Sequence, residues 1–304
     1  MAEMEPVRIH GQSYRLTSAV RDNPAVRDSF NALTRATYGF DFRRWQDLGG
    51  WDESYVPYAL LDGEAVVANV SVNRMALVIA GKPVRGIQLG TVMTAEPYRR
   101  RGLSRFLMQR VLAEWAGKAD LVYLFANDSV LDFYPKFGFV PVEETQYTLD
   151  LPAQGAAPPA ACRPLDMDDP ADRQFLVQRA QEGNPYSEIR VSCGSLALFY
   201  ASGFLKDAFF ALPEWDLAGV LSRTPEGLLV SDLFGKAGAP LPAVLRALAG
   251  GAGGRVVLGF PPAERPDGCL PRPYKEDDCT LFIQKGQEGY FRENAVLFPA
   301  LSHA

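Results

Sequence analysis

Histidine and cysteine are scarce in this chain of 304 residues. The two histidines, His10 and His303, lie near opposite ends, and none of the four cysteines has another cysteine at CxxC spacing. A catalytic triad that uses histidine and a multi-histidine metal site are therefore not expected. The same pattern indicates neither a paired-cysteine zinc site nor a disulfide framework, so we predict reduced thiols and no metal cofactor.

Long apolar runs and an excess of basic residues are also absent. No segment approaches the length of a membrane span, and the opening residues MAEMEPVRIHG lack the basic-then-apolar order of a secretion signal. The formal net charge is -5, whereas nucleic acid or an acidic membrane demands a broad basic face. We therefore expect a cytoplasmic protein with neither nucleic acid nor membrane among its partners. Its oligomeric state is not indicated.

The segment QLGTVMTAEPYRRRGLS, residues 88–104, is the most informative in the chain. It has the pattern of a buried strand, a turn, a cluster of arginines ending in glycine, and the start of a helix over 103–116. The first turn of such a helix presents free backbone N-H groups and a partial positive charge, which together bind anions. A solvated run of arginines is the alternative. We predict a pyrophosphate site formed by Arg99, Arg100, Arg101, Gly102, Leu103 and Ser104.

This run resembles the signature of the GNAT N-acetyltransferase superfamily. In the signature, an arginine or glutamine is followed three residues later by glycine and five residues later by glycine or alanine. Arg99, Gly102 and Ser104 occupy these places. Serine in the last place departs from the pattern, although its small side chain still permits close approach of a diphosphate.

A second block agrees with this resemblance. Residues 121–139, LVYLFANDSVLDFYPKFGF, are similar to the family's next strand, its asparagine (Asn127) and its Tyr-x-x-x-Gly-Phe helix end, which begins at Tyr134. Segments 40–51 and 90–93 are similar to a bacterial subgroup. The resemblance covers roughly the first half of the chain and implies an acetyltransferase domain that uses acetyl-CoA as co-substrate.

The resemblance also implies roles for residues outside the pyrophosphate run. The backbone of Val92, Met93 and Thr94 would pair with the pantetheine arm as an extra strand. Asn127 would help to orient the coenzyme, and Tyr134 would act as general acid toward the departing thiolate. Each role has a structural alternative: the strand residues as core, Asn127 as a capping residue, and Tyr134 as a buried tyrosine in an aromatic patch.

These features predict direct transfer of an acetyl group from acetyl-CoA to a primary amine in a ternary complex, because no suitably supported covalent nucleophile is visible. The amine acceptor, a small molecule or a peptide, is not identified by the sequence. One alternative is a non-catalytic acyl-CoA-binding sensor or scaffold. Another is an acyltransferase that uses a different acyl chain or a hydroxyl acceptor.

The acceptor amine must lose a proton, since an amine with a pKa of ~10.4 is mostly protonated at neutral pH. The proton acceptor stays open between water and five carboxylates: Asp52, Glu53, Glu96, Glu143 and Glu144. An aromatic cluster falls where this fold builds its acceptor groove, although such clusters more often form core. Its members are Tyr38, Phe40, Trp45, Trp51, Tyr55 and Tyr58.

The first half, residues 1–150, is predicted to be one domain with a mixed α/β (α+β) sheet. Periodicity and turn residues indicate helices over 24–38, 42–48, 103–116 and 130–137, and strands over 55–61, 65–73, 75–79, 84–94, 121–125 and 140–149. The last strand is expected to close the sheet. This order is also what the GNAT resemblance implies.

Residues 151–163, LPAQGAAPPAACR, are predicted to be a linker because they are rich in proline, alanine and glycine. The remainder, 164–304, repeats the order of elements with helices over 172–182, 195–201 and 241–248 and strands over 208–212, 217–222, 228–233, 256–260 and 280–284. We therefore expect a second, degenerate GNAT-like domain.

The second domain is not expected to bind the coenzyme. The segment FGKAGAPLP before its helix 241–248 has no arginine and carries prolines where N-H donors are needed. Tandem folds of this kind also occur in the enhanced intracellular survival type of aminoglycoside acetyltransferase, which carries a further lipid-carrier-like domain. We expect no such third domain here.

Overall fold

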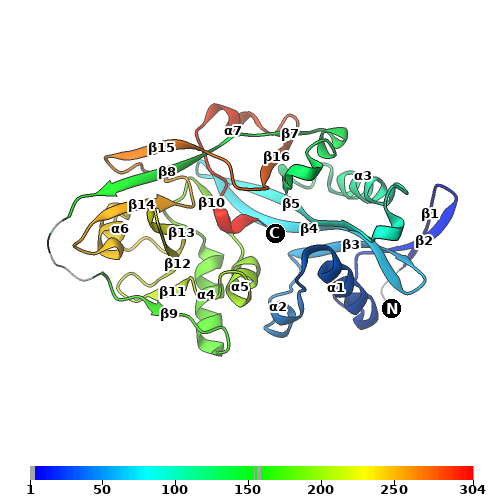
Figure 1. Cartoon of the computed structure of the whole chain (residues 1–304), viewed down its shortest axis with the longest axis horizontal. Coiled ribbons are helices and arrows are strands. Elements are labelled where there is room, and N and C mark those ends of the chain that lie inside the picture. Colours follow the sequence, from blue (N-terminus) through cyan, green and yellow to red (C-terminus); the bar gives the residue numbers. More distant parts are fainter. Residues whose placement is uncertain (1–3, 154, 156–158, 304) are drawn as a thin grey trace.

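The computed structural model describes residues 4–153, 155 and 159–303 of the chain. Over these residues a nine-stranded sheet and a seven-stranded sheet lie side by side (Figure 1). The helices are α1 (Pro24–Tyr38), α2 (Arg43–Asp47), α3 (Leu103–Trp115), α4 (Pro170–Glu182), α5 (Gly194–Ser202), α6 (Leu241–Ala249) and α7 (Gly289–Glu293). No helix in this part of the chain is long and apolar enough to cross a membrane.

The strands of both sheets are numbered in chain order. They are β1 (Glu5–Ile9), β2 (Gln12–Thr17), β3 (Tyr55–Asp62), β4 (Ala65–Ile79), β5 (Lys82–Thr94), β6 (Leu121–Ala126), β7 (Phe139–Pro141), β8 (Glu144–Leu151), β9 (Arg163–Pro164), β10 (Ile189–Ser192), β11 (Phe209–Leu212), β12 (Leu217–Thr224), β13 (Gly227–Gly235), β14 (Gly254–Leu258), β15 (Cys269–Tyr274) and β16 (Thr280–Gln284).

The first sheet has the strand order β1-β2-β3-β4-β5-β6-β16-β7, and β10 also pairs with β4. β5 and β6 run parallel and are joined through α3, as a crossover connection requires. Helix α1 packs on one face through Phe30 and Leu33, and α3 packs on the other through Leu107 and Val111 (Figure 1). The predicted mixed α/β fold is confirmed.

The ends of α1 follow its sequence signals. The Asn23 side chain accepts a hydrogen bond from the Val26 amide at 3.3 Å, Pro24 opens the first turn, and Gly39 ends the helix with a left-handed φ of 81°. The predicted hairpin of β3 and β4 is present, but the two strands expected over 65–79 form one continuous strand. The β1–β2 hairpin was not predicted.

The second sheet has the order β15-β8-β14-β13-β12-β11-β9. β11, β12 and β13 are antiparallel, and β13 pairs in parallel with β14 after the crossover helix α6. This repeats the arrangement of β3 to β6 around α3, so a second GNAT-like fold is confirmed. Pro240 caps α6 and Pro242 lies in its first turn, which removes two backbone N-H donors from that helix start.

Two strands lie in the sheet of the other half, contrary to the prediction. The strand predicted over 140–149 is divided: its first residues lie in β7 at the edge of the first sheet, whereas β8 pairs with β14 and β15 in the second. Conversely, β16 lies between β6 and β7 in the first sheet. Side-chain alternation predicts a strand but does not name its partner. The division into domains at residue 150 stays a prediction, and residues 154 and 156–158 of the expected linker lie outside the described residues.

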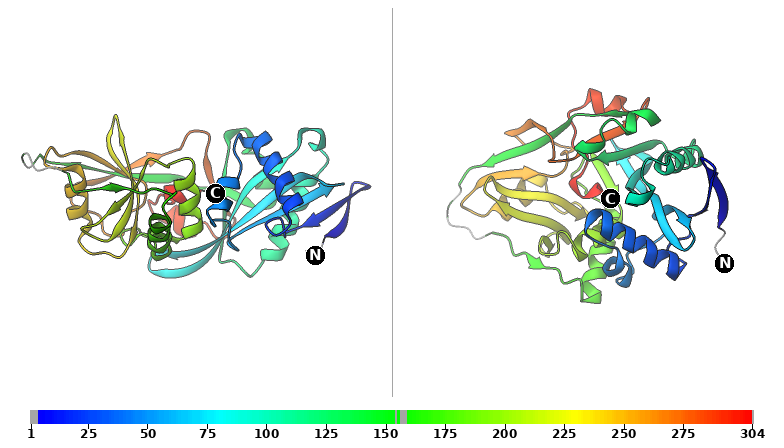
Figure 2. Two further views of the ribbon diagram at one scale, coloured as in Figure 1. Left: turned by 90° about the horizontal axis from the view of Figure 1, so that it is seen from below. Right: turned by 45° about the vertical axis from the view of Figure 1, so that its right-hand side comes forward.

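The two halves share a hydrophobic core. Phe30 and Trp45 of the first half belong to the same buried cluster as Leu176, Leu198 and Phe209 of the second. Figure 2 shows α4 and α5 next to the elements of the first half in both views. The second half therefore packs directly on the helices α1 and α2.

Asp232 is a buried carboxyl on β13, 3% exposed. Its Oδ1 accepts hydrogen bonds from Asn184 Nδ2 at 2.6 Å and from the Leu233 amide at 2.9 Å, yet burial raises the pKa of Asp232 to about 7. The folded chain therefore keeps this proton up to about pH 7, whereas the unfolded chain releases it at about pH 4. The protonated Asp232 therefore contributes its full stabilisation below about pH 4. This contribution is lost as the pH rises from about 4 to about 7.

Asp232→Asn should consequently lose less stability than the wild type between about pH 4 and about pH 7, because the amide does not ionise. The gap between the two proteins should approach ~1.4 kcal/mol for each pH unit of this window. Urea unfolding at both pH values measures it, with Asp207→Asn on the surface as the control. Parallel pH dependence of Asp232→Asn and wild type would contradict the assignment.

Candidate functional site

Strands β5 and β6 separate after a short parallel stretch. Their backbone pairing ends at Leu89 and Leu124, whereas β5 continues to Thr94. The register between β5 and β4 shifts at a bulge, where Thr91 has a positive φ of 48°. Such a bulge bends its strand. The edge of β5 after Leu89 is thus free of β6, and a gap opens between the two strands.

A chain of polar side chains holds this bulge. The Tyr55 hydroxyl and Thr91 Oγ1 are 2.9 Å apart, and Ser71 Oγ donates to the Tyr55 hydroxyl at 2.9 Å. Asn69 Nδ2 contacts both Ser71 Oγ and the Thr91 carbonyl at 2.9 Å. Because these groups are largely buried, the network fixes the backbone of β5 at the point where it leaves β6.

The predicted pyrophosphate loop lies at the end of β5 and leads into α3. Gly102 precedes α3 with a left-handed φ of 79°, and among the described residues no side chain caps this helix. A Cβ on Gly102 would lie 2.7 Å from Nε2 of the exposed His10 side chain, which would have to move, and the left-handed conformation itself favours glycine. Thr94 Oγ1 and Ser104 Oγ are 2.7 Å apart and join the strand end to the helix start.

A hollow of about 400 Å³ opens at this helix start and carries positive charge. Arg99, Arg100 and Arg105 line it, while the Arg101 guanidinium stacks over the Tyr98 ring at 4.9 Å. Uncapped N-H groups, a glycine cradle and several cations fit a pyrophosphate. His10 also lines the hollow. Sequence reasoning missed it because the hairpin that carries it was not predicted.

Tyr134 begins the short 3₁₀ turn Tyr134–Phe137 and is 6% exposed. Its ring packs edge-on against Phe133 with centroids 5.2 Å apart, and burial raises the pKa of Tyr134 to about 12. Burial, and after it Tyr134, raise the pKa of Tyr38. The Tyr38 hydroxyl donates to the Val92 carbonyl at 2.8 Å, and Val92, on the free part of β5, packs against the hydrophobic cluster that contains Tyr134.

The other predicted coenzyme residues lie at two places. Val92 and Thr94 are half-buried on the free part of β5, and Met93 is buried in the core beneath it. Asn127 follows β6, and its Nδ2 donates to Asp278 Oδ2 at 2.9 Å. The side-chain amide of Asn127 is thus engaged by the second half of the chain, and its contact with the coenzyme stays a prediction.

An aromatic pocket of about 280 Å³ reaches Thr91 of the bulge. Its apolar wall consists of Phe40, Phe42, Trp45, Tyr55, Leu196, Phe199, Tyr200 and Phe204, and its polar groups come from Ser54, Asn73, Thr91, Cys193, Ser195 and His303. Half of this lining comes from Cys193 and later residues, as expected if the second half of the chain helps to close the acceptor groove, although the sequence did not name these residues.

The predicted acceptor cluster divides between this pocket and the core. Phe40, Trp45 and Tyr55 line the pocket. Trp51 packs behind Tyr55 with ring centroids 5.3 Å apart, and the Tyr58 hydroxyl donates to Glu114 Oε1 at 2.8 Å on the opposite face of the sheet. The cluster therefore contributes one wall of the pocket and part of the core behind it.

The five candidate proton acceptors lie outside the described lining of the pocket. Asp52 Oδ1 accepts from the Ser54 amide at 2.7 Å, while Glu96 and Glu143 are exposed. Glu144 accepts from the Phe298 amide at 2.9 Å, and burial raises its pKa to about 7. In the pocket itself, burial lowers the pKa of His303 to about 3. The choice of proton acceptor stays open.

Comparison with known proteins links the first half to a family. Residues 26–142 match the family model described as an acetyltransferase (GNAT) domain. No curated protein matches the sequence significantly. The matched range contains the gap between β5 and β6, the pyrophosphate loop and Tyr134.

Solved structures of similar fold span both halves of the chain. Eis1 from Mycobacterium abscessus is 16% identical with a TM-score of 0.53, over 88% of this chain and 72% of that chain. A GCN5-related N-acetyltransferase from Kribbella flavida is 16% identical with a TM-score of 0.52, over 89% and 70%. One from Anabaena variabilis is 15% identical with a TM-score of 0.51, over 88% and 72%. These similarities concern the fold.

Proposed function

Because residues 26–142 match the model of an acetyltransferase (GNAT) domain, we propose that the chain is an acyltransferase that transfers an acetyl group from acetyl-CoA directly to a primary amine. The observation that carries the proposal is the convergence of four features on one gap. These are the uncapped start of α3, the free edge of β5, the Tyr134 hydroxyl and the aromatic pocket at Thr91.

The chain would bind acetyl-CoA through backbone and charge. The N-H groups of Leu103, Ser104 and Arg105 at the start of α3, with the side chains of Arg99 and Arg100, would hold the pyrophosphate. The pantetheine arm would add as a strand to the edge of β5 that β6 leaves free. On this edge the Tyr38 hydroxyl donates a hydrogen bond to the Val92 carbonyl. An amide N-H of the pantetheine arm would replace that hydroxyl when the coenzyme binds.

In the reaction, the amine nitrogen would attack the thioester carbonyl, so that a C–N bond forms and the C–S bond breaks. Backbone N-H groups of β5 would stabilise the charge on the carbonyl oxygen. The amine proton would pass to water or a carboxylate, and the Tyr134 hydroxyl would donate to the departing thiolate. Burial raises the pKa of Cys193 to about 11, so this pocket thiol is protonated and does not favour a covalent intermediate.

The pocket argues for a small amine with an apolar or aromatic body. Its volume of about 280 Å³ is small for a ligand site, and its wall is mainly aromatic. Among the described residues that line it, none is Asp or Glu. A polycation such as a polyamine or an aminoglycoside would find no carboxylate there to offset its charge, whereas an arylalkylamine would pack against the rings.

A free-thiol assay tests the proposal directly. Full-length protein with acetyl-CoA should release thiol with arylalkylamines and far less with polyamines, aminoglycosides or lysine peptides. Thiol release with a polycation alone would refute the acceptor class and keep the acetyltransferase. Coenzyme binding without thiol release over the whole panel would instead support a sensor.

Phe204 offers a variant of the pocket mouth that should still fold, because it is 59% exposed. Phe204→Ala should raise KM for an aromatic amine about tenfold, from the loss of ~1.4 kcal/mol of ring contact, with little change in kcat. Leu270→Ala on β15 is the matched control, since Leu270 is 62% exposed and lies outside the pocket. Equal KM values for the two variants would contradict the pocket assignment.

A further inference from the structure

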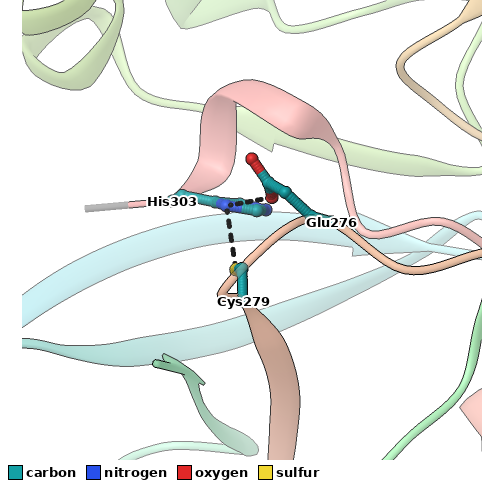
Figure 3. Close-up of side chains that lie close together, drawn as sticks. All are labelled: Glu276, Cys279 and His303. Atoms are coloured by element: carbon teal, nitrogen blue, oxygen red, sulfur yellow. Dashed lines mark hydrogen bonds and ion pairs between the residues drawn. The ribbon is translucent and has the colours of Figure 1, made fainter. Parts of the chain in front are cut away.

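A carboxylate, a thiol and an imidazole converge at the end of the chain. Glu276 and Cys279 come from the loop between β15 and β16, and His303 follows the last short turn of the chain (Figure 3). His303 Nδ1 lies 3.3 Å from Glu276 Oε2 and 3.9 Å from Cys279 Sγ. One ligand atom from each residue lies within 4.8 Å of the other two.

The contacts do not form a nucleophile–base–acid relay. In such a relay the nucleophile and the acid contact different nitrogens of the imidazole. Here both the thiol and the carboxylate approach Nδ1 (Figure 3).

An ion pair between His303 and Glu276 does not explain the cluster either, because it leaves the approach of Cys279 to the same nitrogen unexplained. A neutral imidazole, a carboxylate and a cysteine are three of the donor groups that transition metals take from proteins. Their convergence on one point is the feature that requires an explanation.

From this geometry we propose that Glu276, Cys279 and His303 bind one divalent transition-metal ion, with zinc as the expected metal. Zinc binds nitrogen at about 2.0–2.1 Å, carboxylate oxygen at about 2.0–2.2 Å and thiolate sulfur at about 2.3 Å. A tetrahedral centre with these bonds places nitrogen about 3.3 Å from oxygen and about 3.6 Å from sulfur. The observed separations are 3.3 Å and 3.9 Å, so the thiol needs to move by only a few tenths of an ångström.

The surroundings favour a cation at this point. Glu276 places a carboxylate against the imidazole and close to the thiol. A divalent ion would offset the charge of this carboxylate and stabilise the thiolate that binds it. The Glu276 side chain is 44% exposed and that of His303 20%, so an ion can enter from the Glu276 side. Water would complete the fourth position.

A metal here would fix the end of the chain as a wall of the acceptor pocket. His303 lines that pocket, its carbonyl accepts from the Tyr200 hydroxyl at 2.6 Å, and its ring stacks on Phe125 with centroids 3.5 Å apart. The same loop also reaches the end of β6, where Asp278 accepts from Asn127. The ion would thus join the pocket wall to the loop after β6 as a structural centre.

Cobalt titration of the full-length protein, purified without a histidine tag and treated with chelator, tests the site. About one equivalent of Co²⁺ should bind with the near-ultraviolet thiolate-to-cobalt band and the visible bands of a tetrahedral centre, and Zn²⁺ should displace it. Cys279→Ser should abolish the thiolate band, whereas Cys162→Ser, a half-buried thiol in the second half, should retain it. Absence of stoichiometric binding in the wild type, or an unchanged band in Cys279→Ser, would overturn the proposal.

His303→Gln gives a second, independent result at a residue that lies outside the described helices and strands. Zn²⁺ should raise the Tm of the wild type and leave that of a folded His303→Gln variant unchanged. Equal Zn²⁺ shifts of Tm in both proteins would overturn the site. Neither measurement depends on acetyl transfer.

Discussion

Tyr134→Phe is expected to lower kcat by ~10² or more while leaving acetyl-CoA affinity and folding nearly unchanged. The variant keeps the ring, which packs edge-on against Phe133, and removes only the hydroxyl. Tyr134 belongs to the hydrophobic cluster against which Val92 of the free part of β5 packs, and the thioester would be held along that part of the strand. Steady-state kinetics with the best amine and calorimetric titration with acetyl-CoA measure the two effects separately.

The pH dependence of kcat is a second test of the role of Tyr134. Burial raises the pKa of Tyr134 to about 12, so the hydroxyl keeps its proton across the neutral range and remains a donor. Wild-type kcat should therefore show no loss from Tyr134 ionisation below about pH 10. Tyr134→Phe should lower kcat by the same factor at each pH in this range. A factor that disappears as the pH falls would contradict the role of general acid.

Tyr123 provides the matched control. It is fully buried on β6, and its hydroxyl has no hydrogen-bond partner among the described residues. Tyr123→Phe should leave kcat unchanged and keep or raise Tm, because it removes an unsatisfied buried hydroxyl. If Tyr134→Phe keeps the kcat of the wild type and only its free energy of unfolding changes, by ~1 kcal/mol, Tyr134 is a core residue. The proton donor to the thiolate would then be unidentified.

Local signals predict much of the fold because they act over a few residues. The Asn23-Pro24 start and Gly39 end of α1 are set by capping and backbone conformation, and both are visible in the sequence. The helix after Gly102 follows from the spacing of its apolar residues. The predicted pyrophosphate loop is one continuous segment, so its glycine and the helix start that follows it could also be predicted from the sequence.

The remaining features depend on contacts between distant segments. The exchange of β8 and β16 between the sheets is decided by pairing, which alternation of side chains does not encode. β15 contains Pro271 and Pro273, which argue against a strand, and it forms only because it lies at the edge of its sheet.

The site residues that the sequence did not identify also depend on contacts between distant segments. Half of the acceptor pocket is supplied by the second half of the chain, and His303 reaches Glu276 and Cys279 from 24 or more residues away. No short motif connects these positions. A search for CxxC or multi-histidine spacing therefore does not detect the proposed metal site, which has one carboxylate, one thiol and one imidazole.

Gly102→Glu is expected to abolish acetyl-CoA binding, with at least ~10²-fold loss of affinity in calorimetry. Gly102 has a left-handed φ of 79°, and any Cβ there would lie 2.7 Å from His10 Nε2. The glutamate would add strain, bulk and a negative charge at the helix start that the pyrophosphate would occupy. Because the second half carries prolines at the corresponding helix start, no second binding site should remain.

Two variants separate these causes from general damage to α3. Gly117→Glu lies just beyond the other end of α3, at a similar φ of 73° and with open space around its Cβ, so it carries comparable strain and charge but should keep wild-type affinity. Gly102→Ala has the strain and the His10 contact without the charge, and should fall between wild type and Gly102→Glu. Unchanged affinity in a folded Gly102→Glu variant, or two equivalents of acetyl-CoA bound by the wild type, would place the coenzyme elsewhere. Loss of affinity confined to the Gly102 variants would mean that the anion is held at the start of α3 itself, because the far end of the same helix would have tolerated the same change.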